Sequence, residues 1–166
     1  MTSHRLPIVA GLLLGTSLAS HSASPEKVDL VLVDKSERRL ELSAGGKTVR
    51  TYSIALGGSS IGHKRQEGDE RTPEGRYLLD WRNARSGYFR SIHISYPNSK
   101  DEEFARSLGV KPGGMIMIHG QPNGYSWWGW VLQMLDWTDG CIAVDNAEMA
   151  EIWDMVPDGT PIEINP

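Results

Sequence analysis

The sequence contains one cysteine, Cys141, and the nearest histidine before it along the chain is His119. Cysteine attacks acyl carbonyls as the thiolate, and an unperturbed thiol is only a few per cent ionised near neutral pH, so it needs a neighbour that takes its proton. Histidine suits this role because its unperturbed pKa lies close to physiological pH. The two residues are 22 positions apart, which leaves room for a loop that returns the thiol to the imidazole. The pair predicts a cysteine nucleophile with a histidine general base.

The backbone beside the cysteine could stabilise the oxyanion of an acyl transfer. Gly140 precedes Cys141 in the segment TDGC. Glycine lets the backbone turn sharply, so the consecutive amides of Gly140 and Cys141 can point at one spot. Acyl transfer depends on such donors, since removing one costs roughly 10²-fold or more in rate. The TDGC turn therefore predicts part of an oxyanion hole.

A structural interpretation of the same residues is also open. A histidine that ends a strand is commonly a hydrogen-bonded structural residue, and cysteine is among the most buried residue types. A single cysteine cannot form an internal disulfide, so the thiol is buried and inert, paired with another chain, or reactive. Two features favour a reactive thiol: it is solitary in a chain expected to enter an oxidising compartment, and both residues lie in turns bordered by glycine.

The first 23 residues, MTSHRLPIVAGLLLGTSLASHSA, have the organisation of a secretory signal peptide. A short polar segment with Arg5 precedes an apolar stretch that ends in small residues. This stretch is shorter than the about 20 residues that a membrane-spanning helix needs, and an uncleaved anchor is the alternative. With cleavage after Ser22 or Ala23, we expect one domain over residues 24–166, located in the periplasm.

The composition is that of an ordinary globular protein, with 39% hydrophobic and 23% charged residues. The net charge is −4, and lysine and arginine alternate with acids, as in HKRQEGDER at 63–71. No basic stripe is available for nucleic acid or anionic lipid. These two classes of partner are therefore excluded.

The hydrophobic pattern predicts a mainly β domain with a few short helices. Strands are expected over 27–34, 38–43, 47–56, 76–83, 88–96, 115–119 and 160–164, with a long functional or mobile loop over 57–75. A helix over 100–110 would begin at Ser99 as N-cap, with Glu102 completing a capping box, and end at Gly109. Further helices are expected over 129–137 and over 146–156, the latter capped by Asp145 or Asn146.

Several motifs together resemble the L,D-transpeptidase catalytic domain, the YkuD-like (ErfK-YbiS-YcfS-YnhG-like) family. They are GDERTPEG, the PGG ahead of the histidine strand, IHG, a tryptophan-rich stretch and TDGCIAV, and the resemblance runs from about Val28 to Ile164. It implies a β-sandwich-like fold and a cysteine nucleophile, here Cys141, that acts on peptidoglycan stem peptides. It also implies His119 as general base, oriented by the backbone carbonyl of Gly120, and no metal or organic cofactor.

Two positions depart from the family pattern. Asp139 stands where the family commonly has histidine, and Ala143 stands where it often has arginine or asparagine. A carboxylate that pointed at the thiol would raise the thiol pKa. We therefore expect Asp139 to point away from the thiol or to hold the loop, and the family's acceptor and substrate preferences need not transfer.

A second group of residues is a set of candidates for substrate binding: His93, Trp128, Thr138 and Asp139. Their structural alternatives are a core or rim position for His93 and a core that pins the loop for the tryptophans, which are Trp127, Trp128, Trp130 and Trp137. As a lid or platform, those tryptophans would instead contact sugar or stem peptide. Asp136 could contact His119, and a solvated loop acid is its expected role.

The leading hypothesis is an exported L,D-transpeptidase, expected to act as a monomer. Cys141 would form a thioester with a tetrapeptide stem, release D-alanine and pass the acyl group to an amine of another stem or of a wall-anchored protein. Resolution by water would make it an L,D-carboxypeptidase or an amidase. A non-catalytic wall-binding module is the third hypothesis, and it would not react with a carbapenem. In other secreted cysteine–histidine wall peptidases the cysteine precedes the histidine, which disfavours them.

Overall fold

The computed structural model describes residues 27–124 and 134–166. Its strands form one eight-stranded sheet in the order β3-β2-β1-β8-β4-β5-β6-β7. The strands are β1 (Leu30–Asp34), β2 (Arg39–Ala44), β3 (Lys47–Ser53), β4 (Gly75–Asn83), β5 (Ser91–Ile94), β6 (Met117–His119), β7 (Ile142–Ala143) and β8 (Thr160–Asn165). The helices are α1 (Ser99–Ser107) and α3 (Asn146–Met155).

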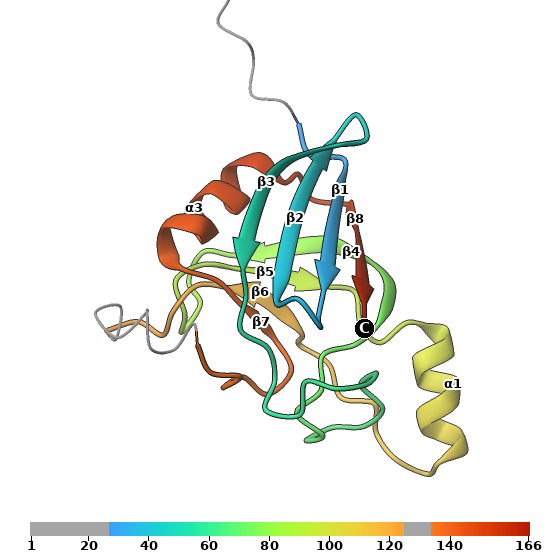
Figure 1. The fold of residues 1–166 in the computed structure, drawn as a ribbon. Helices are drawn as coiled ribbons and strands as arrows, with labels where there is room; N and C mark the ends of the chain where they lie inside the picture. Colours follow the sequence, from blue (N-terminus) through green and yellow to red (C-terminus); the bar gives the residue numbers. More distant parts are fainter. Residues whose placement is uncertain (1–26, 125–133) are drawn as a thin grey trace, which may run out of the picture.

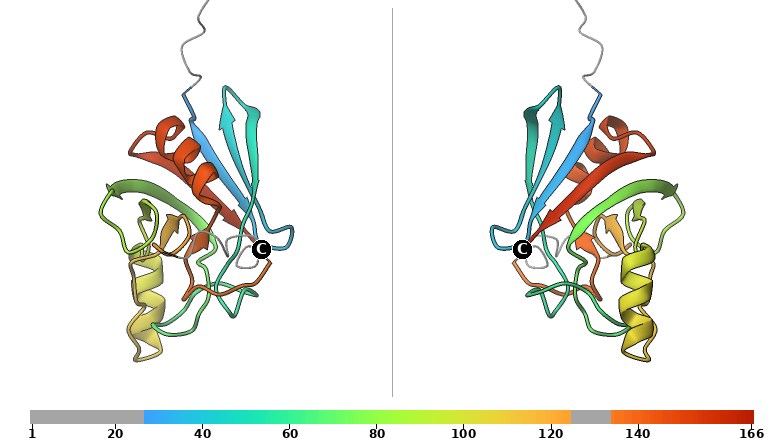
Figure 2. Two further views of the ribbon diagram at one scale, coloured as in Figure 1. Left: turned by 90° about the vertical axis from the view of Figure 1, so that its left-hand side faces the viewer. Right: turned by 90° about the vertical axis from the view of Figure 1, so that its right-hand side faces the viewer.

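The sheet curls so that its two halves face each other. Strands β1, β2, β3 and β8 run crosswise to β4, β5 and β6, and the two helices lie at opposite ends of the molecule (Figures 1 and 2). Most pairs are antiparallel, but β1 pairs with β8 and β6 pairs with β7 in parallel. This arrangement confirms the predicted mainly β, sandwich-like fold.

The core lies between the two halves because alternate residues of each strand face inward. One half contributes side chains such as Val31, Leu40 and Ile162, and the other contributes residues such as Ile92 and Ile118, all of them buried. Helix α3 closes one end of this core with Met149 and Ile152, the apolar face that its sequence pattern predicts.

The start of α1 corrects the sequence prediction by one residue. The N-cap is Asn98, whose side chain accepts from the Lys100 and Asp101 amides, and Asp101 completes the capping box in place of Glu102. Ser99 is instead the first helical residue. The register has a physical reason, since it turns Asp101 inward, where its carboxylate also accepts a hydrogen bond from the Tyr77 hydroxyl at 3.0 Å.

The helix predicted over 129–137 is wrong at 134–137, the part that lies within the described residues, because that segment is not helical. Asp136 accepts hydrogen bonds from the Leu56 amide at 3.0 Å and from Arg38, and Thr138 forms a β-bridge with Gly57. These contacts hold the segment extended against the loop after β3. The prediction of Asp136 as a solvated acid is also wrong, since it is half-buried and tied to Arg38.

The loop over 57–75 has a fixed path, held by ion pairs. Lys64 is buried and lies 2.8 Å from Asp69, whose carboxylate also accepts backbone amides of the loop. At the loop's start, a Cβ on Gly57 would lie 1.9 Å from the carbonyl oxygen of Glu70 and 2.9 Å from the Cα of Gly140. Gly57 is therefore required by close backbone packing between this loop and the turn before Cys141.

We predict that Gly57→Ala lowers the free energy of unfolding by about 1–3 kcal/mol, the usual cost of forcing extra atoms into a packed site. Gly58→Ala is the matched control, since the close contact of its Cβ, at 2.6 Å, is with the flexible carboxylate of Glu70, and the Asp136 carbonyl lies at an ordinary 3.9 Å; it should cost less than about 1 kcal/mol. Urea denaturation of both variants measures the difference. Equal losses for the two variants would show that the Gly57 contact is not a constraint.

Candidate active site

The pairing of β6 with β7 places Cys141 and His119 on one face of the sheet. Ile118 pairs with Ile142 and His119 pairs with Ala143 in parallel register. Cys141 directly precedes β7 and therefore lies beside Met117, two residues before His119. Side chains alternate between faces along a strand and are shared across a register pair. The thiol and the imidazole consequently project from the same face of neighbouring strands.

His119 is held in one tautomer by its surroundings. Its side chain is buried, and Nδ1 lies 2.7 Å from the carbonyl oxygen of Gly120. A carbonyl only accepts hydrogen bonds, so Nδ1 carries the proton and Nε2 keeps its lone pair. Tyr88 stacks on the ring at 4.2 Å and Trp137 meets it edge-on at 5.7 Å. Burial lowers the pKa of His119, against a smaller raising effect of the Gly120 bond, so the imidazole is neutral and basic at neutral pH.

The thiol of Cys141 is partly exposed and contacts the backbone of the segment that enters β6. Its sulfur lies 3.7 Å from the carbonyl oxygen of Met115, to which the thiol donates. Burial raises the pKa of Cys141, the Met117 amide lowers it, the charge of Asp139 raises it and Lys64 lowers it, with a net increase. Both side chains are therefore uncharged at rest, Cys141 as a thiol and His119 as a neutral imidazole. A neutral imidazole that keeps Nε2 as acceptor is able to take a proton from a thiol.

The turn before Cys141 is fixed by Thr138 and Gly140. The Thr138 hydroxyl donates to the Cys141 carbonyl at 2.8 Å and accepts from the Gly140 amide at 3.2 Å. Gly140 has φ +115°, and a Cβ there would lie 2.4 Å from the carbonyl oxygen of Arg71. Thr138 therefore shapes the turn in this structure. The Gly140 amide is engaged, so its predicted oxyanion role requires exchange of this bond.

Gln121 and Asn146 form hydrogen bonds that hold the segments following β6 and β7. The Gln121 amide donates to Asn146 Oδ1 at 2.8 Å, and Gln121 Nε2 donates to the Val144 carbonyl at 3.1 Å. A Cβ on Gly120 would lie 2.6 Å from Asn146 Oδ1. Because these bonds join the start of α3 to the segment after His119, they fix the Gly120 carbonyl. No sequence motif predicted Gln121, Asn146 or Tyr88 as part of the site, because their roles depend on contacts distant in sequence.

Of the remaining predicted residues, His93 and Asp139 lie within the described part of the chain and Trp128 lies outside it. His93 lies on β5, with Nδ1 2.7 Å from Asp80 and its ring stacked on Trp81. Asp139 is exposed and lines a hollow of about 400 Å³ together with other loop residues, namely Lys64, Glu67, Gly68, Glu70, Gly113 and Gly114. Trp128, with Trp127 and Trp130, lies outside the described residues. The substrate-binding roles of these residues stay predictions.

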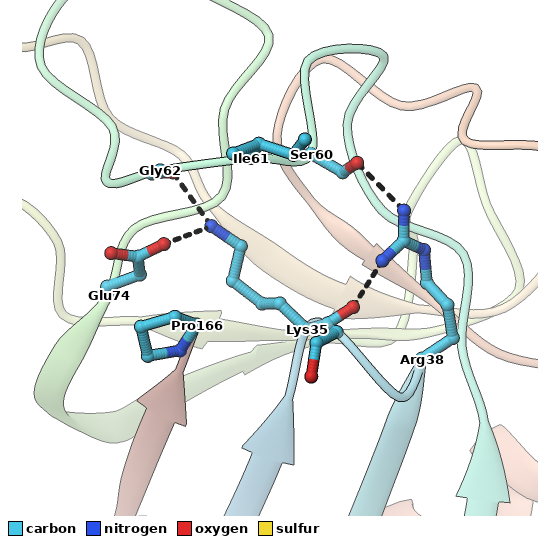
Figure 3. Close-up of a pocket in the computed structure, with 8 residues that line it drawn as sticks. Lys35, Arg38, Ser60, Ile61, Gly62, Glu74 and Pro166 are labelled. Carbon is cyan, nitrogen blue, oxygen red and sulfur yellow. Dashed lines mark hydrogen bonds and ion pairs between the residues drawn. The ribbon is translucent and has the colours of Figure 1, made fainter.

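A second, smaller cavity of about 150 Å³ lies at the end of β1 (Figure 3). The Lys35 ammonium donates to the Gly62 carbonyl and to Glu74, both at 2.7 Å, and also to the Thr72 carbonyl. Arg38 donates to the Ser60 hydroxyl at 2.8 Å. Because both cations donate to groups of the loop over 57–75, these contacts anchor that loop to the turn after β1.

Two further properties concern the described part of the chain, residues 27–124 and 134–166. It contains no group of three or more histidine, cysteine or acidic side chains arranged to hold a metal ion. Among its helices, none has the length and apolar character needed to cross a membrane.

This fold, with Cys141 and His119 at the ends of neighbouring strands, points to one class of protein. Residues 29–164 match the YkuD family, the L,D-transpeptidase catalytic domain. The chain belongs to this family.

Relatives and solved structures agree with this assignment. The chain is 27% identical over 157 residues to YafK of Escherichia coli (strain K12), a candidate L,D-transpeptidase by its name, which covers 87% of this chain and 56% of YafK. The K307A mutant of Pgp2, the helical cell shape determining protein of Campylobacter jejuni, has a TM-score of 0.66 and 28% identity over 84% of this chain and 47% of its own.

The LD transpeptidase LdtMt1, solved in complex with imipenem, shares the fold with a TM-score of 0.53 at 18% identity, over 81% of this chain and 57% of its own. The chain thus spans about half the length of each of these three proteins.

We predict that Asp139→Asn increases the rate at which iodoacetamide alkylates Cys141 at neutral pH and low salt. The carboxylate raises the thiol pKa, so removing its charge lowers that pKa and increases the thiolate fraction. Because Asp139 is exposed, the gain should shrink as salt screens the charge. Glu103→Gln, an exposed acid on α1, is the control. An unchanged or slower alkylation rate at low salt would contradict the assigned electrostatic role.

Proposed function

We propose that this protein is an exported cysteine L,D-transpeptidase that acts on peptidoglycan stem peptides in the periplasm. The observation that carries the proposal is the shared face of Cys141 and His119, with Nε2 of the imidazole left as acceptor by the Nδ1 bond to Gly120. Membership of the YkuD family supplies the reaction class.

In the first half-reaction, Sγ of Cys141 attacks the carbonyl of the diaminoacyl residue in a tetrapeptide stem while its proton passes to Nε2 of His119. The tetrahedral intermediate expels the amine of the terminal D-alanine, which takes the proton from the imidazolium. A thioester bond has formed and a peptide bond has broken. Both proton transfers use Nε2, the ring nitrogen opposite the Nδ1 that donates to Gly120, so the proposed mechanism needs no further acid.

In the second half-reaction, an amine attacks the thioester and neutral His119 takes its proton. The thiol leaves as the new amide forms, which restores the resting pair. The acceptor amine comes from a neighbouring stem or from a wall-anchored protein. The partly exposed sulfur of Cys141 leaves access for such an acceptor.

The cell-envelope role is supported from two directions. The N-terminal sequence has the pattern of a secretory signal peptide, and a similar structure belongs to a helical cell shape determining protein. We infer that the substrate is the cell wall and that the outcome bears on cell shape.

Hydrolysis is the alternative outcome at the same site. Water in place of the amine would release a shortened stem, making the protein an L,D-carboxypeptidase, or an amidase if the acyl donor is an anchored chain. The first half-reaction is identical, so the two outcomes differ only in the nucleophile that reaches the thioester.

The test is mass spectrometry of products after the mature protein, under reducing conditions, reacts with disaccharide-tetrapeptide fragments. We expect a cross-linked dimer and free D-alanine, both absent with Cys141→Ala. Tripeptide and D-alanine without dimer would establish the carboxypeptidase instead. Unchanged substrate with both proteins would refute the tetrapeptide as acyl donor.

A further inference from the structure

A row of side chains runs across the sheet from Cys141 to β4. Cys141 lies beside Met117, which pairs with His93 on β5. On β4, Leu79 pairs with Ile94 and Arg82 pairs with Ile92, so Asp80 and Trp81 lie opposite His93. Residues in register share a face. The row therefore continues the face that carries the thiol.

The opposite face of these strands packs into the core. The side chains of the row therefore project from the face that is turned away from the core. Leu79, Ile92, Ile118 and Ile142 all have exposed fractions of 1% or less. Their neighbours in the row alternate with them and point away from the core. Neighbouring strands are about 4.8 Å apart, so three spacings place β4 about 14 Å from Cys141.

An aromatic and acidic cluster, formed by Asp80, Trp81 and His93, ends this row. The Trp81 and His93 rings stack at 4.7 Å with an interplanar angle of 18°, and Asp80 lies 2.7 Å from His93 Nδ1. The pairing of β4 with β5 is irregular between Leu79 and Arg82, and the additional residue lets Asp80 and Trp81 both reach His93. Trp81 remains 38% exposed.

We propose that this cluster is a saccharide subsite, which binds a sugar ring of the donor's glycan strand. The C–H face of a pyranose ring is apolar and packs on an exposed indole. Asp80 has a second carboxylate oxygen for a sugar hydroxyl, and within the described chain no hydrogen-bond partner is found for Nε2 of His93. The cluster thus combines an aromatic surface with an acceptor and a ring nitrogen.

The spacing fits a peptidoglycan donor, and this step rests on the proposed function. The reacting carbonyl belongs to the third stem residue, so three residues and the linker to the sugar separate it from the glycan. Three extended residues span at most about 10–11 Å, and the linker adds to this. The distance from Cys141 to Trp81 is therefore within the reach of one stem and its linker, although Met117 between them is itself buried.

The first test is binding, in a protein that cannot turn over substrate. The disaccharide of N-acetylglucosamine and N-acetylmuramic acid is titrated into Cys141→Ala, and the indole N–H signals are followed by NMR. We expect the Trp81 signal to shift, and Trp81→Ala to weaken disaccharide affinity roughly three- to tenfold. Trp81→Phe should restore part of the affinity. Phe104→Ala removes another exposed aromatic, on α1, and should leave binding unchanged.

The second test compares disaccharide-tetrapeptide with the free tetrapeptide as donor. Trp81→Ala should raise KM for the saccharide donor several-fold more than KM for the free peptide, while Phe104→Ala should leave their ratio unchanged. An equal change in both KM values, together with unaltered disaccharide binding, would overturn the subsite. If neither donor reacts with the wild-type protein, the proposed function fails, and the disaccharide titration still decides the subsite.

Discussion

The parallel register of β6 and β7 is the constraint on which the site depends. A slip of one residue would move Cys141 to the core face and separate it from His119, because side chains alternate between faces. β7 has only two residues, so its register is fixed from outside. The Ala55–Ala143 and Gly57–Thr138 bridges hold the segment from the other side. The loop after β3 thus fixes the position of the segment that carries Cys141.

Charge at the site is arranged to keep the resting pair neutral. Burial lowers the pKa of His119 and raises that of Cys141, so each favours its uncharged form. A neutral thiol is protected from indiscriminate oxidation, since the thiolate is the reactive form. Asp139 adds to this protection, and Lys64 opposes it. In the proposed mechanism, reactivity is therefore coupled to substrate binding, which brings about the proton transfer to His119.

Much of the fold could be predicted from the sequence, because strand alternation and helix caps are local signals. The helix over 146–156 and the strand over 160–164 occur within a residue or two of their predicted bounds. The predicted cap at Ser99 failed by one position because the buried contact between Asp101 and Tyr77 decides the register. Asp136 was misjudged for a similar reason, since its partner Arg38 is distant in sequence.

The candidate site shows the same division. Cys141, His119 and the glycines beside them stand out by residue type and spacing, and family resemblance added the Gly120 carbonyl. Supporting residues such as Gln121 and Asn146 carry no local signal, and neither does the row that links Cys141 to Trp81. The row exists because β5 and β6 lie between β4 and β7 in the sheet, and this strand order is not a local property of the sequence.

In the proposed mechanism, Cys141 is the nucleophile that becomes acylated. The most direct test is intact-protein mass spectrometry of the mature chain after incubation with imipenem, followed by peptide mapping, with Cys141→Ala in parallel. We expect one covalent adduct per chain, located on the peptide that contains Cys141 and absent from the variant. No adduct on the reduced wild-type protein, or an equal adduct on the variant, would contradict it.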